Sequence, residues 1–417
     1  MKVLTGRPSG VMLAALLLYL AISAAIVSTR GVSFMCDEWH DPAIADFKVF
    51  YAAGGLVTDS HNRFLYYPGV LPLSFPNAFR PAHANFFNPP LLALLYAPLT
   101  AFDIVTAFHV LVVLMAACAV LLVVLAALWR PQPLAVVVAC LAVASFWPVY
   151  SSLRLGNMSL LFALCSGLAL TALDQKKQIP AGLLVAFLAL KPSIALVPLG
   201  FVAWLGDRRG IIAATAGVLV FILLPFLLLG ARSLGDYRQL LNANRADSFT
   251  LRGGISGGAN YMFNWNGFIA RLFRTDPKPL IVLPFYVVTA ALMIKVWIGG
   301  DLRSGWLAAI LATLLALPHM LWYDWVLLLP ACLAIALARP SLLLVGLLAL
   351  LHLCVNLSTY QMEHLKAFSV AFFVATPAAF VVLAYLAFEQ EITTVARGPM
   401  RRTSPGSLET TVPAPAA

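Results

Sequence analysis

Long apolar runs fill most of this chain, and they restrict what it can fold into. The runs at Asp103–Trp129 and Ile211–Gly230 reach the length, about 20 residues, that lets a helix cross the core of a bilayer. Charged residues make up 11% of the 417 residues, whereas a soluble domain carries about 25%. So little charge cannot cover a surface that faces water. The sequence therefore predicts an all-α polytopic membrane protein.

Basic residues in the short loops between these runs set the expected topology. Lys and Arg collect on the cytoplasmic side of a membrane, so Lys2 and Arg7 place the N-terminus there. The run Val11–Val27 is longer than the apolar core of a signal peptide and is expected to remain as the first helix. Counting the runs predicts about twelve spans with both termini in the cytoplasm. The net charge of +10 belongs to these loops and indicates no nucleic-acid partner.

Two long polar interruptions are expected on the extracytoplasmic side. The first, residues 28–101, includes a short apolar segment at Pro89–Thr100 that is interpreted as an interfacial or re-entrant helix. The second, residues 231–266, carries four arginines. These arginines need an anionic partner, unless the loop is long enough to be translocated whatever its charge. Residues 1–390 are predicted to form one membrane-embedded domain, and residues 391–417 a disordered cytoplasmic tail.

Asp46 stands at the centre of the first loop, ahead of the aromatic residues Phe50 and Tyr51. A carboxylate near the lipid headgroups could act as a general base that takes a proton from an attacking hydroxyl. It could also cap the N-terminus of a short helix over residues 47–53, which the spacing alone favours. The neighbouring acidic cluster at residues 37–41 has side chains able to bind a cation. Its spacing matches no defined metal motif, so a solvated loop is favoured and no metal is predicted.

A lysine interrupts the apolar segment Pro180–Leu205, which lies between two basic loops. Because Lys191 is followed by Pro192, the segment is predicted to break into two short helices at this point. A charge and a helix break at this depth are tolerated where they line a polar cavity. The counter-ion would be a lipid-borne phosphate or an aspartate. Snorkelling of the lysine to the interface is the alternative.

Further polar residues fall on the same predicted side of the membrane. His319 and Asp324 flank an aromatic pair, a combination that suits binding of a sugar or a phosphate, although an interfacial aromatic belt gives the same pattern. An amide-rich turn, Asn260–Gly267, has the composition of a carbohydrate-binding surface. Arg154 and Asn157 flank Gly156, which would let the backbone approach a ligand. Their convergence predicts one polar cavity at the outer membrane face.

In their order along the chain, these segments resemble glycosyltransferase family 87, whose members are GT-C-fold α-mannosyltransferases that use polyprenyl-phosphate-mannose. The resemblance covers roughly residues 10–390. It is carried by Asp46–Gly54 (Asp-Phe-x-x-Phe-Tyr-x-x-Gly), Leu65-Tyr66, Asn88-Pro89-Pro90, Ala97-Pro98-Leu99, Leu155-Gly156-Asn157, Leu190-Lys191-Pro192, Asn264-Trp265-Asn266-Gly267, and Pro318-His319 with Tyr323-Asp324.

The resemblance implies a catalytic aspartate in the first extracytoplasmic loop, at Asp46, and a lipid-phosphate sugar donor. The expected product is a glycan or glycolipid carrying one more hexose, formed with inversion at the outer face of the plasma membrane. No metal and no cofactor are required. The donor phosphate and sugar are expected to contact Lys191, Arg154, Asn157, Arg245, Arg252 and His319, and the acceptor or sugar to contact Tyr51, Asn264, Asn266, Trp322, Tyr323 and Asp324.

A transporter or lipid flippase is the competing interpretation, because it too would place polar groups in apolar helices. Many transporters show internal repeats, and this sequence shows none. Its polar groups are also predicted to gather at the outer face, whereas transporter sites lie near the middle of the membrane. A transferase is therefore favoured.

Overall fold

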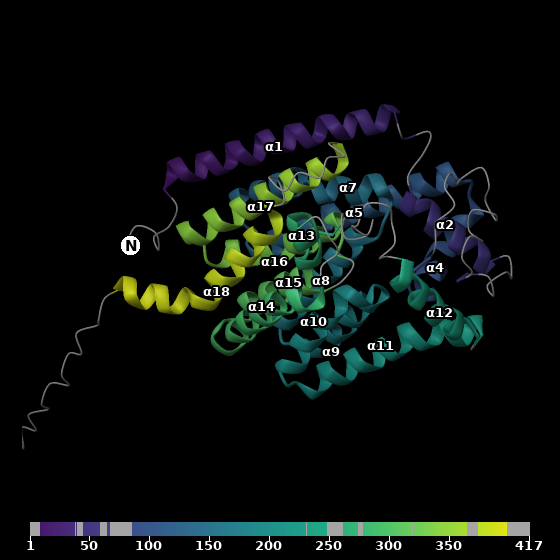
Figure 1. Ribbon diagram of the computed structural model, residues 1–417. Helices are drawn as coiled ribbons and strands as arrows, with labels where there is room; N and C mark the ends of the chain where they lie inside the picture. The colour runs from purple at the N-terminus through teal and green to yellow at the C-terminus, as the bar shows by residue number, and fades with distance from the viewer. Residues whose placement is uncertain are drawn as a thin grey trace, which may run out of the picture.

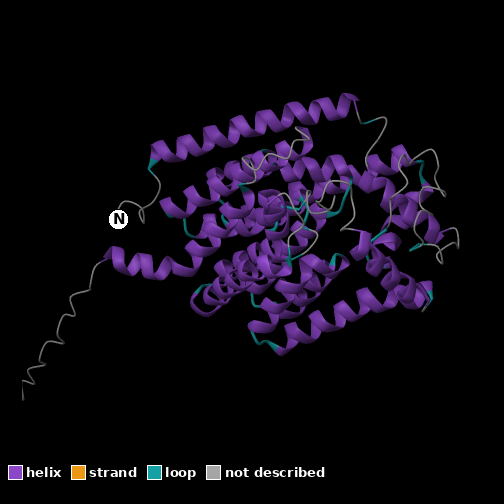
Figure 2. Cartoon of the chain, viewed as in Figure 1, coloured by secondary structure: helices purple, strands orange, loops and turns teal. Residues whose placement is uncertain are grey.

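Helices make up the regular secondary structure of the part of the chain that the computed structural model describes (Figure 2). The one β-type pairing within this part is an isolated bridge between Met262 and Leu321. The predicted all-α class is thus confirmed. The described residues are 9–37, 39, 45–58, 65–66, 86–230, 232–247, 262–273, 278–317, 320–364 and 374–397.

Five of the described helices are long and apolar enough to cross a membrane. A sixth span results if α6 and α7, which meet at a 53° bend, are taken together. Other apolar helices are only 10–17 residues long, so helix length by itself gives fewer spans than the sequence predicts. The long helices are α1 (Gly10–Asp37), α5 (Ile104–Trp129), α11 (Arg208–Leu229), α14 (Pro279–Gly299) and α17 (Leu342–His364), and the bent pair is α6 (Pro133–Ala144) with α7 (Trp147–Leu155).

Apolar side chains cover the outside of these helices as well as the inside of the bundle. Val113 and Leu128 of α5 and Leu227 of α11 are exposed, which suits contact with lipid. The centre is occupied by α15 (Leu302–Ala316), where Trp306 packs against Phe201. Around it lie α8 (Ser159–Asp174), α10 (Pro192–Trp204) and α16 (Leu328–Ala338), together with α18 (Ala375–Arg397).

Two breaks interrupt apolar segments of the bundle. The first falls at Lys191, between α9 (Gln178–Phe187) with its 3₁₀ extension η3 (Leu188–Leu190) and α10, and it confirms the break predicted from Pro192. Lys191 has the extended backbone conformation that a residue before proline prefers.

The second break separates α6 from α7, where the sequence predicted one crossing at Leu134–Tyr150. A break in a membrane helix frees backbone groups that need new partners. The Asn356 amide of α17 supplies them, because it accepts from the Trp147 N–H at 2.8 Å and donates to the Ser145 carbonyl at 2.8 Å.

The helices of both predicted outer loops gather at one end of the bundle (Figure 1). α1 continues to Asp37, well past the expected start of the first loop at residue 28. The second loop contains a helix where only a polar connection was expected. The helices at this end are α2 (Ala45–Thr58), α4 (Pro90–Tyr96) with its 3₁₀ extension η2 (Ala97–Ala101), and α12 (Arg232–Asp247).

Ion pairs join loops that the sequence assigned to the cytoplasm. Arg303 pairs with Asp174 at 2.7 Å, and Arg339 pairs with Asp301 at 3.3 Å and Glu389 at 3.2 Å. Figure 1 shows α18 and the start of α1 at the end of the bundle opposite α2, α4 and α12. α18 runs to Arg397, so residues 391–397 of the predicted tail are helical, and the remainder of the tail lies outside the described residues.

Candidate active site

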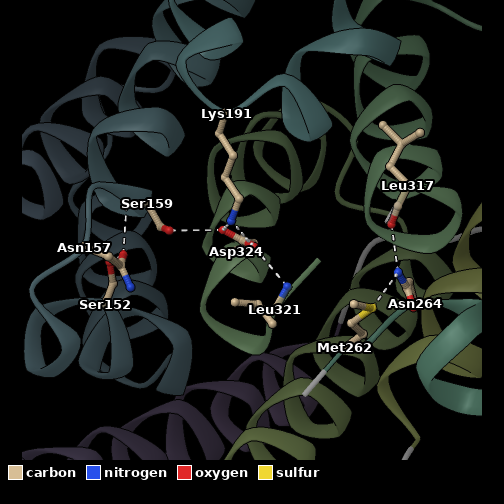
Figure 3. A network of polar contacts seen from close by, with 9 residues as sticks. All are labelled: Ser152, Asn157, Ser159, Lys191, Met262, Asn264, Leu317, Leu321 and Asp324. Carbon is tan, nitrogen blue, oxygen red and sulfur yellow. Dashed lines mark hydrogen bonds and ion pairs between the residues drawn. The ribbon is translucent and has the colours of Figure 1, made fainter. Parts of the chain in front are cut away.

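Lys191 and Asp324 form a buried ion pair between the helix break and η5 (Trp322–Leu327). The Lys191 Nζ lies 2.6 Å from both carboxylate oxygens (Figure 3). The Lys191 side chain is 17% exposed and that of Asp324 is 1% exposed. Of the two counter-ions that the sequence allowed for Lys191, the structure supplies the aspartate.

Two further hydrogen bonds hold Asp324. Its Oδ2 accepts from the backbone N–H of Leu321, and its Oδ1 accepts from the Ser159 hydroxyl at 3.2 Å. The bond to Leu321 closes the first turn of η5, as an acidic residue in a capping box does. Both oxygens of Asp324 are thus engaged within the protein. The carboxylate positions Lys191, and the predicted contact between Asp324 and a sugar gains no support from this arrangement.

Asn157 lies beside this pair, directly after the end of α7. Gly156 adopts a left-handed conformation (φ 61°), and the last turn closes with the two backbone hydrogen bonds of a Schellman motif. The Asn157 Oδ1 then accepts from the Ser152 hydroxyl at 2.8 Å and from the Ser159 N–H at 3.1 Å. The amide is 3% exposed, and its Nδ2 has no hydrogen-bond partner among the described residues.

Asp46 completes the cluster. Its side chain is half-buried as a whole, but its Oδ2 is covered and has no hydrogen-bond partner in the described part of the chain. Burial raises the pKa of the Asp46 carboxyl above its ordinary value, and the charge of Asp324 adds to this rise. The Tyr323 hydroxyl, the Lys191 ammonium and the Asn157 amide lower this pKa. Asp46 therefore shares one electrostatic environment with all four residues.

Close packing fixes Asp46 against Asn157. α2 begins at Ala45, so Asp46 lies inside its first turn and does not take the N-cap position that the sequence left open. A Cβ on Gly54 would come within 2.9 Å of the Tyr96 backbone, and one on Gly156 would come within 2.9 Å of the Phe47 Cβ of α2. The Tyr96 hydroxyl donates to the Gly156 carbonyl at 3.1 Å. Glycines at these contacts let α2, α4 and α7 meet.

Two other residues that were predicted to bind sugar form hydrogen bonds with backbone groups of the protein. The Tyr51 hydroxyl donates to the Phe102 carbonyl at 2.8 Å. Asn264 is fully buried, where its Nδ2 donates to the Leu317 carbonyl at 2.8 Å and its Oδ1 accepts from the Gly267 N–H at 3.0 Å, which caps α13 (Trp265–Phe273). Figure 3 shows this network apart from the one around Asp324.

Three remaining sugar candidates differ in their surroundings. Asn266 lies beside the Tyr286 hydroxyl of α14. Trp322 is half-buried and packs edge-on against Tyr323, with ring centroids 5.3 Å apart. The Tyr323 ring also lies 5.3 Å from the Lys191 Nζ, a cation–π distance. Of these three residues, Tyr323 is the one that contacts Lys191 of the ion pair.

Three of the six predicted ligands of the donor phosphate and sugar, Lys191, Arg154 and Asn157, have described side chains. Arg154 is half-buried in the last turn of α7. Arg245 belongs to α12, but its side chain is not described, and Arg252 and His319 lie outside the described residues. Much of the acidic cluster at residues 37–41 lies outside them too. In the described ranges, no group of three or more His, Cys, Asp and Glu residues is placed to hold a metal ion.

Sequence reasoning missed Ser159 and Tyr96. Ser159 had a usable signal, because an Asn whose side chain accepts from the N–H two residues later is a common turn, and Asn157 stands two residues before it. Tyr96 gave no such signal, since its role depends on a contact with Gly156, which is remote in sequence.

A protein-family model for glycosyltransferase family 87 matches residues 86–321, which is more than half of the chain. The chain belongs to glycosyltransferase family 87. It is therefore a membrane enzyme that transfers a glycosyl group from a donor to an acceptor. The matched residues include Asn157 and Lys191, whereas Asp46 and Asp324 lie outside them. No curated protein and no solved structure matches the chain.

Proposed function

We propose that this family 87 enzyme transfers a hexose, mannose, from a polyprenyl-phosphate donor to a hydroxyl of a glycan or glycolipid acceptor, with Asp46 as the general base. The observation that carries the proposal is the unpaired, buried Oδ2 of Asp46 beside Lys191 and Asn157. A carboxylate whose pKa is raised by burial is a stronger base than an ordinary aspartate. Carboxylates in such surroundings are frequent at catalytic sites.

The reaction is a single displacement at the anomeric carbon. Asp46 removes the proton of the acceptor hydroxyl as its oxygen attacks the sugar. The bond from the anomeric carbon to the phosphate oxygen breaks, and its electron pair leaves with the lipid phosphate. Attack from the face opposite the leaving group inverts the anomeric configuration. The phosphate leaves as an anion and needs no acid, so one carboxylate base is sufficient and the scheme uses no metal or cofactor.

Cationic side chains would hold the donor phosphate. Lys191 has three N–H donors, and Asp324 offers it two oxygens, so one N–H is left for a ligand. The Lys191–Asp324 pair has little net charge, so we assign most of the phosphate binding to the arginines. The proposed ligands besides Lys191 are Arg154, Arg245, Arg252 and His319.

The same proposal includes a GT-C fold with about twelve spans and an active site on the extracytoplasmic side of the plasma membrane. This part of the proposal is supported by the residues found at the two ends of the bundle, which differ. The basic loops pair with one another at one end, and α2, which carries Asp46, lies with α4 and α12 at the other (Figure 1).

Transfer of labelled mannose from polyprenyl-phosphate-mannose, measured with purified protein in lipid nanodiscs, tests the function. Asp46→Asn is expected to lower turnover by about 10²–10⁴-fold, the usual contribution of a general base. Lys295→Met is the matched control and should keep full activity. It removes the exposed pair with Glu391 at the end of the bundle that carries α18, which we call the basic end.

Full turnover by Asp46→Asn contradicts the proposed base. Absence of any transfer by the wild type, with movement of a lipid or sugar that survives Asp46→Asn, contradicts the proposed reaction and points instead to a transporter.

A further inference from the structure

Two neighbouring side chains in the site each keep one buried polar atom without a hydrogen-bond partner among the described residues. These atoms are the Asp46 Oδ2 and the Asn157 Nδ2. A buried polar group without a partner costs about 1–3 kcal/mol, so such atoms are rare unless something binds them. The Asn157 amide is close enough to the Asp46 carboxyl to lower its pKa, but the two atoms do not meet in hydrogen-bonding geometry. A donor and an acceptor held next to each other in this way point to a ligand that bridges them.

The identity of each unpaired atom is fixed by its surroundings. The Ser159 backbone N–H can only donate, so the Asn157 atom facing it at 3.1 Å must be the oxygen. The Ser152 hydroxyl, at 2.8 Å from the same atom, is compatible with this assignment. The unpaired atom of Asn157 is therefore the NH₂ group, a donor. The unpaired Asp46 oxygen is an acceptor when the carboxyl is ionised.

One chemical group satisfies both atoms, because a hydroxyl donates one hydrogen bond and accepts others. A phosphate would bring negative charge against the Asp46 carboxylate and would have no hydrogen to give it. An ammonium group would meet the Asn157 N–H with no acceptor and would lie close to Lys191. The pair is thus complementary to a neutral alcohol.

We propose that Asn157 and Asp46 together bind the attacking hydroxyl of the acceptor, so that Asn157 is an acceptor-binding residue. This inference rests on the proposed function and moves Asn157 away from the donor phosphate. The hydroxyl gives its hydrogen bond to the Asp46 Oδ2 and accepts one from the Asn157 Nδ2. Its remaining lone pair is then free to attack the sugar while Asp46 takes the proton.

The surrounding structure suits this role. The Asn157 amide is held by two hydrogen bonds, by the left-handed Gly156 and by the end of α7, so its Nδ2 is positioned before any ligand arrives. A site built to hydrogen-bond a hydroxyl discriminates strongly against an analogue that lacks it, because its own polar atoms are then left unpaired. Asn157 is therefore expected to help select which acceptor hydroxyl reacts.

Binding of alkyl hexopyranosides without donor tests the inference separately from the transfer reaction. The probes are octyl mannopyranoside and each of its monodeoxy forms, titrated by calorimetry into the full chain in nanodiscs. The wild type is expected to bind the parent glycoside about 25–100-fold more tightly than one of the monodeoxy forms, because that form lacks two hydrogen bonds worth about 5–10-fold each. Asn157→Ala is expected to lower this discrimination by about 5–10-fold and to keep the part that the Asp46 Oδ2 supplies.

Ser152→Ala is the matched control, because it removes one bond to the Asn157 oxygen and leaves the bond from Ser159. It should keep most of the discrimination. With the donor present, Asn157→Ala should raise the KM for the acceptor and leave the KM for the donor within about twofold of the wild-type value.

Three results overturn the inference. They are equal binding of all the glycosides by the wild type, unchanged discrimination in Asn157→Ala, and a rise in donor KM that matches the rise in acceptor KM. Unchanged discrimination combined with lower stability would mean that the two atoms hold a structural water. If the discrimination is seen as expected but the wild type transfers no mannose, the proposed reaction fails and the hydroxyl site stands.

Discussion

The two ends of the bundle both carry ion pairs, but the pairs differ in their surroundings. At the basic end, Lys295 and Glu391 lie 2.8 Å apart with side chains 39% and 64% exposed. At the end that carries Asp46, the Lys191–Asp324 pair is closer and almost fully enclosed. Exposed pairs contribute about 0–1 kcal/mol each because water and salt screen them. A buried pair has lost its water, so each partner depends on the other.

This difference separates two uses of charge in one membrane protein. The exposed Lys295–Glu391 pair joins α14 to α18. The buried pair has a large desolvation cost, which suits a site better than it suits general stability. Its four hydrogen bonds offset part of that cost. We therefore expect substitutions at the buried pair to affect both stability and catalysis, and substitutions at the basic end to affect neither.

The largest expected effect comes from Lys191→Met. It leaves the Asp324 carboxylate buried without its cation, and breaking a buried pair in this way costs about 3–5 kcal/mol. The loss should be seen as lower stability against denaturant in detergent micelles. The double variant Lys191→Met/Asp324→Asn should recover most of it, because no charge is then left unpaired. Wild-type stability of the single variant would contradict the comparison.

Asn356→Leu should have the next largest effect. It removes the amide that joins the backbone groups at the break between α6 and α7, and unpaired buried groups cost about 1–3 kcal/mol. The same denaturant titration measures the loss. Thr359→Val is the control in the same helix, because the Thr359 hydroxyl donates only to the Val355 carbonyl one turn earlier. Equal stability of the two variants would show that the break needs no bridge.

The pH dependence of transfer should reveal how the buried pair acts on Asp46. The base must be ionised, so activity falls as pH drops through the pKa of Asp46, which burial places above the ordinary value of 3.8. Asp324→Asn removes a charge that raises this pKa, so the acid limb of kcat/KM should move to lower pH. Lys191→Met removes a charge that lowers it, so the limb should move to higher pH. Shifts in the same direction would contradict this electrostatic link.

The smallest expected effect comes from Lys295→Met at the basic end. The lost pair with Glu391 is exposed, so stability should change by about 1 kcal/mol or less and transfer should be unchanged. Both are measured with the assays above. A loss as large as that of Lys191→Met would mean that exposure does not distinguish the two ends.

The sequence was informative wherever the cause was local. The apolar runs gave the helices and the membrane class, and Pro192 gave the break at Lys191. It failed where local signals were weak, as at the end of α1, which continues to Asp37. The break between α6 and α7 had a local signal that the prediction did not use, because Pro148 stands in the first turn of α7. The partner of the freed backbone groups had none, since Asn356 belongs to another helix.

By itself, the sequence determined that this protein lies in a membrane, which apolar segments form helices, and which few polar residues could serve a site. These follow from hydrophobicity and proline, which act within a few residues along the chain. The tertiary structure decided that Lys191 pairs with Asp324, 133 residues away, and that Asn157 turns its amide towards Asp46. Such choices depend on which helices pack together, and packing joins residues that are distant in sequence.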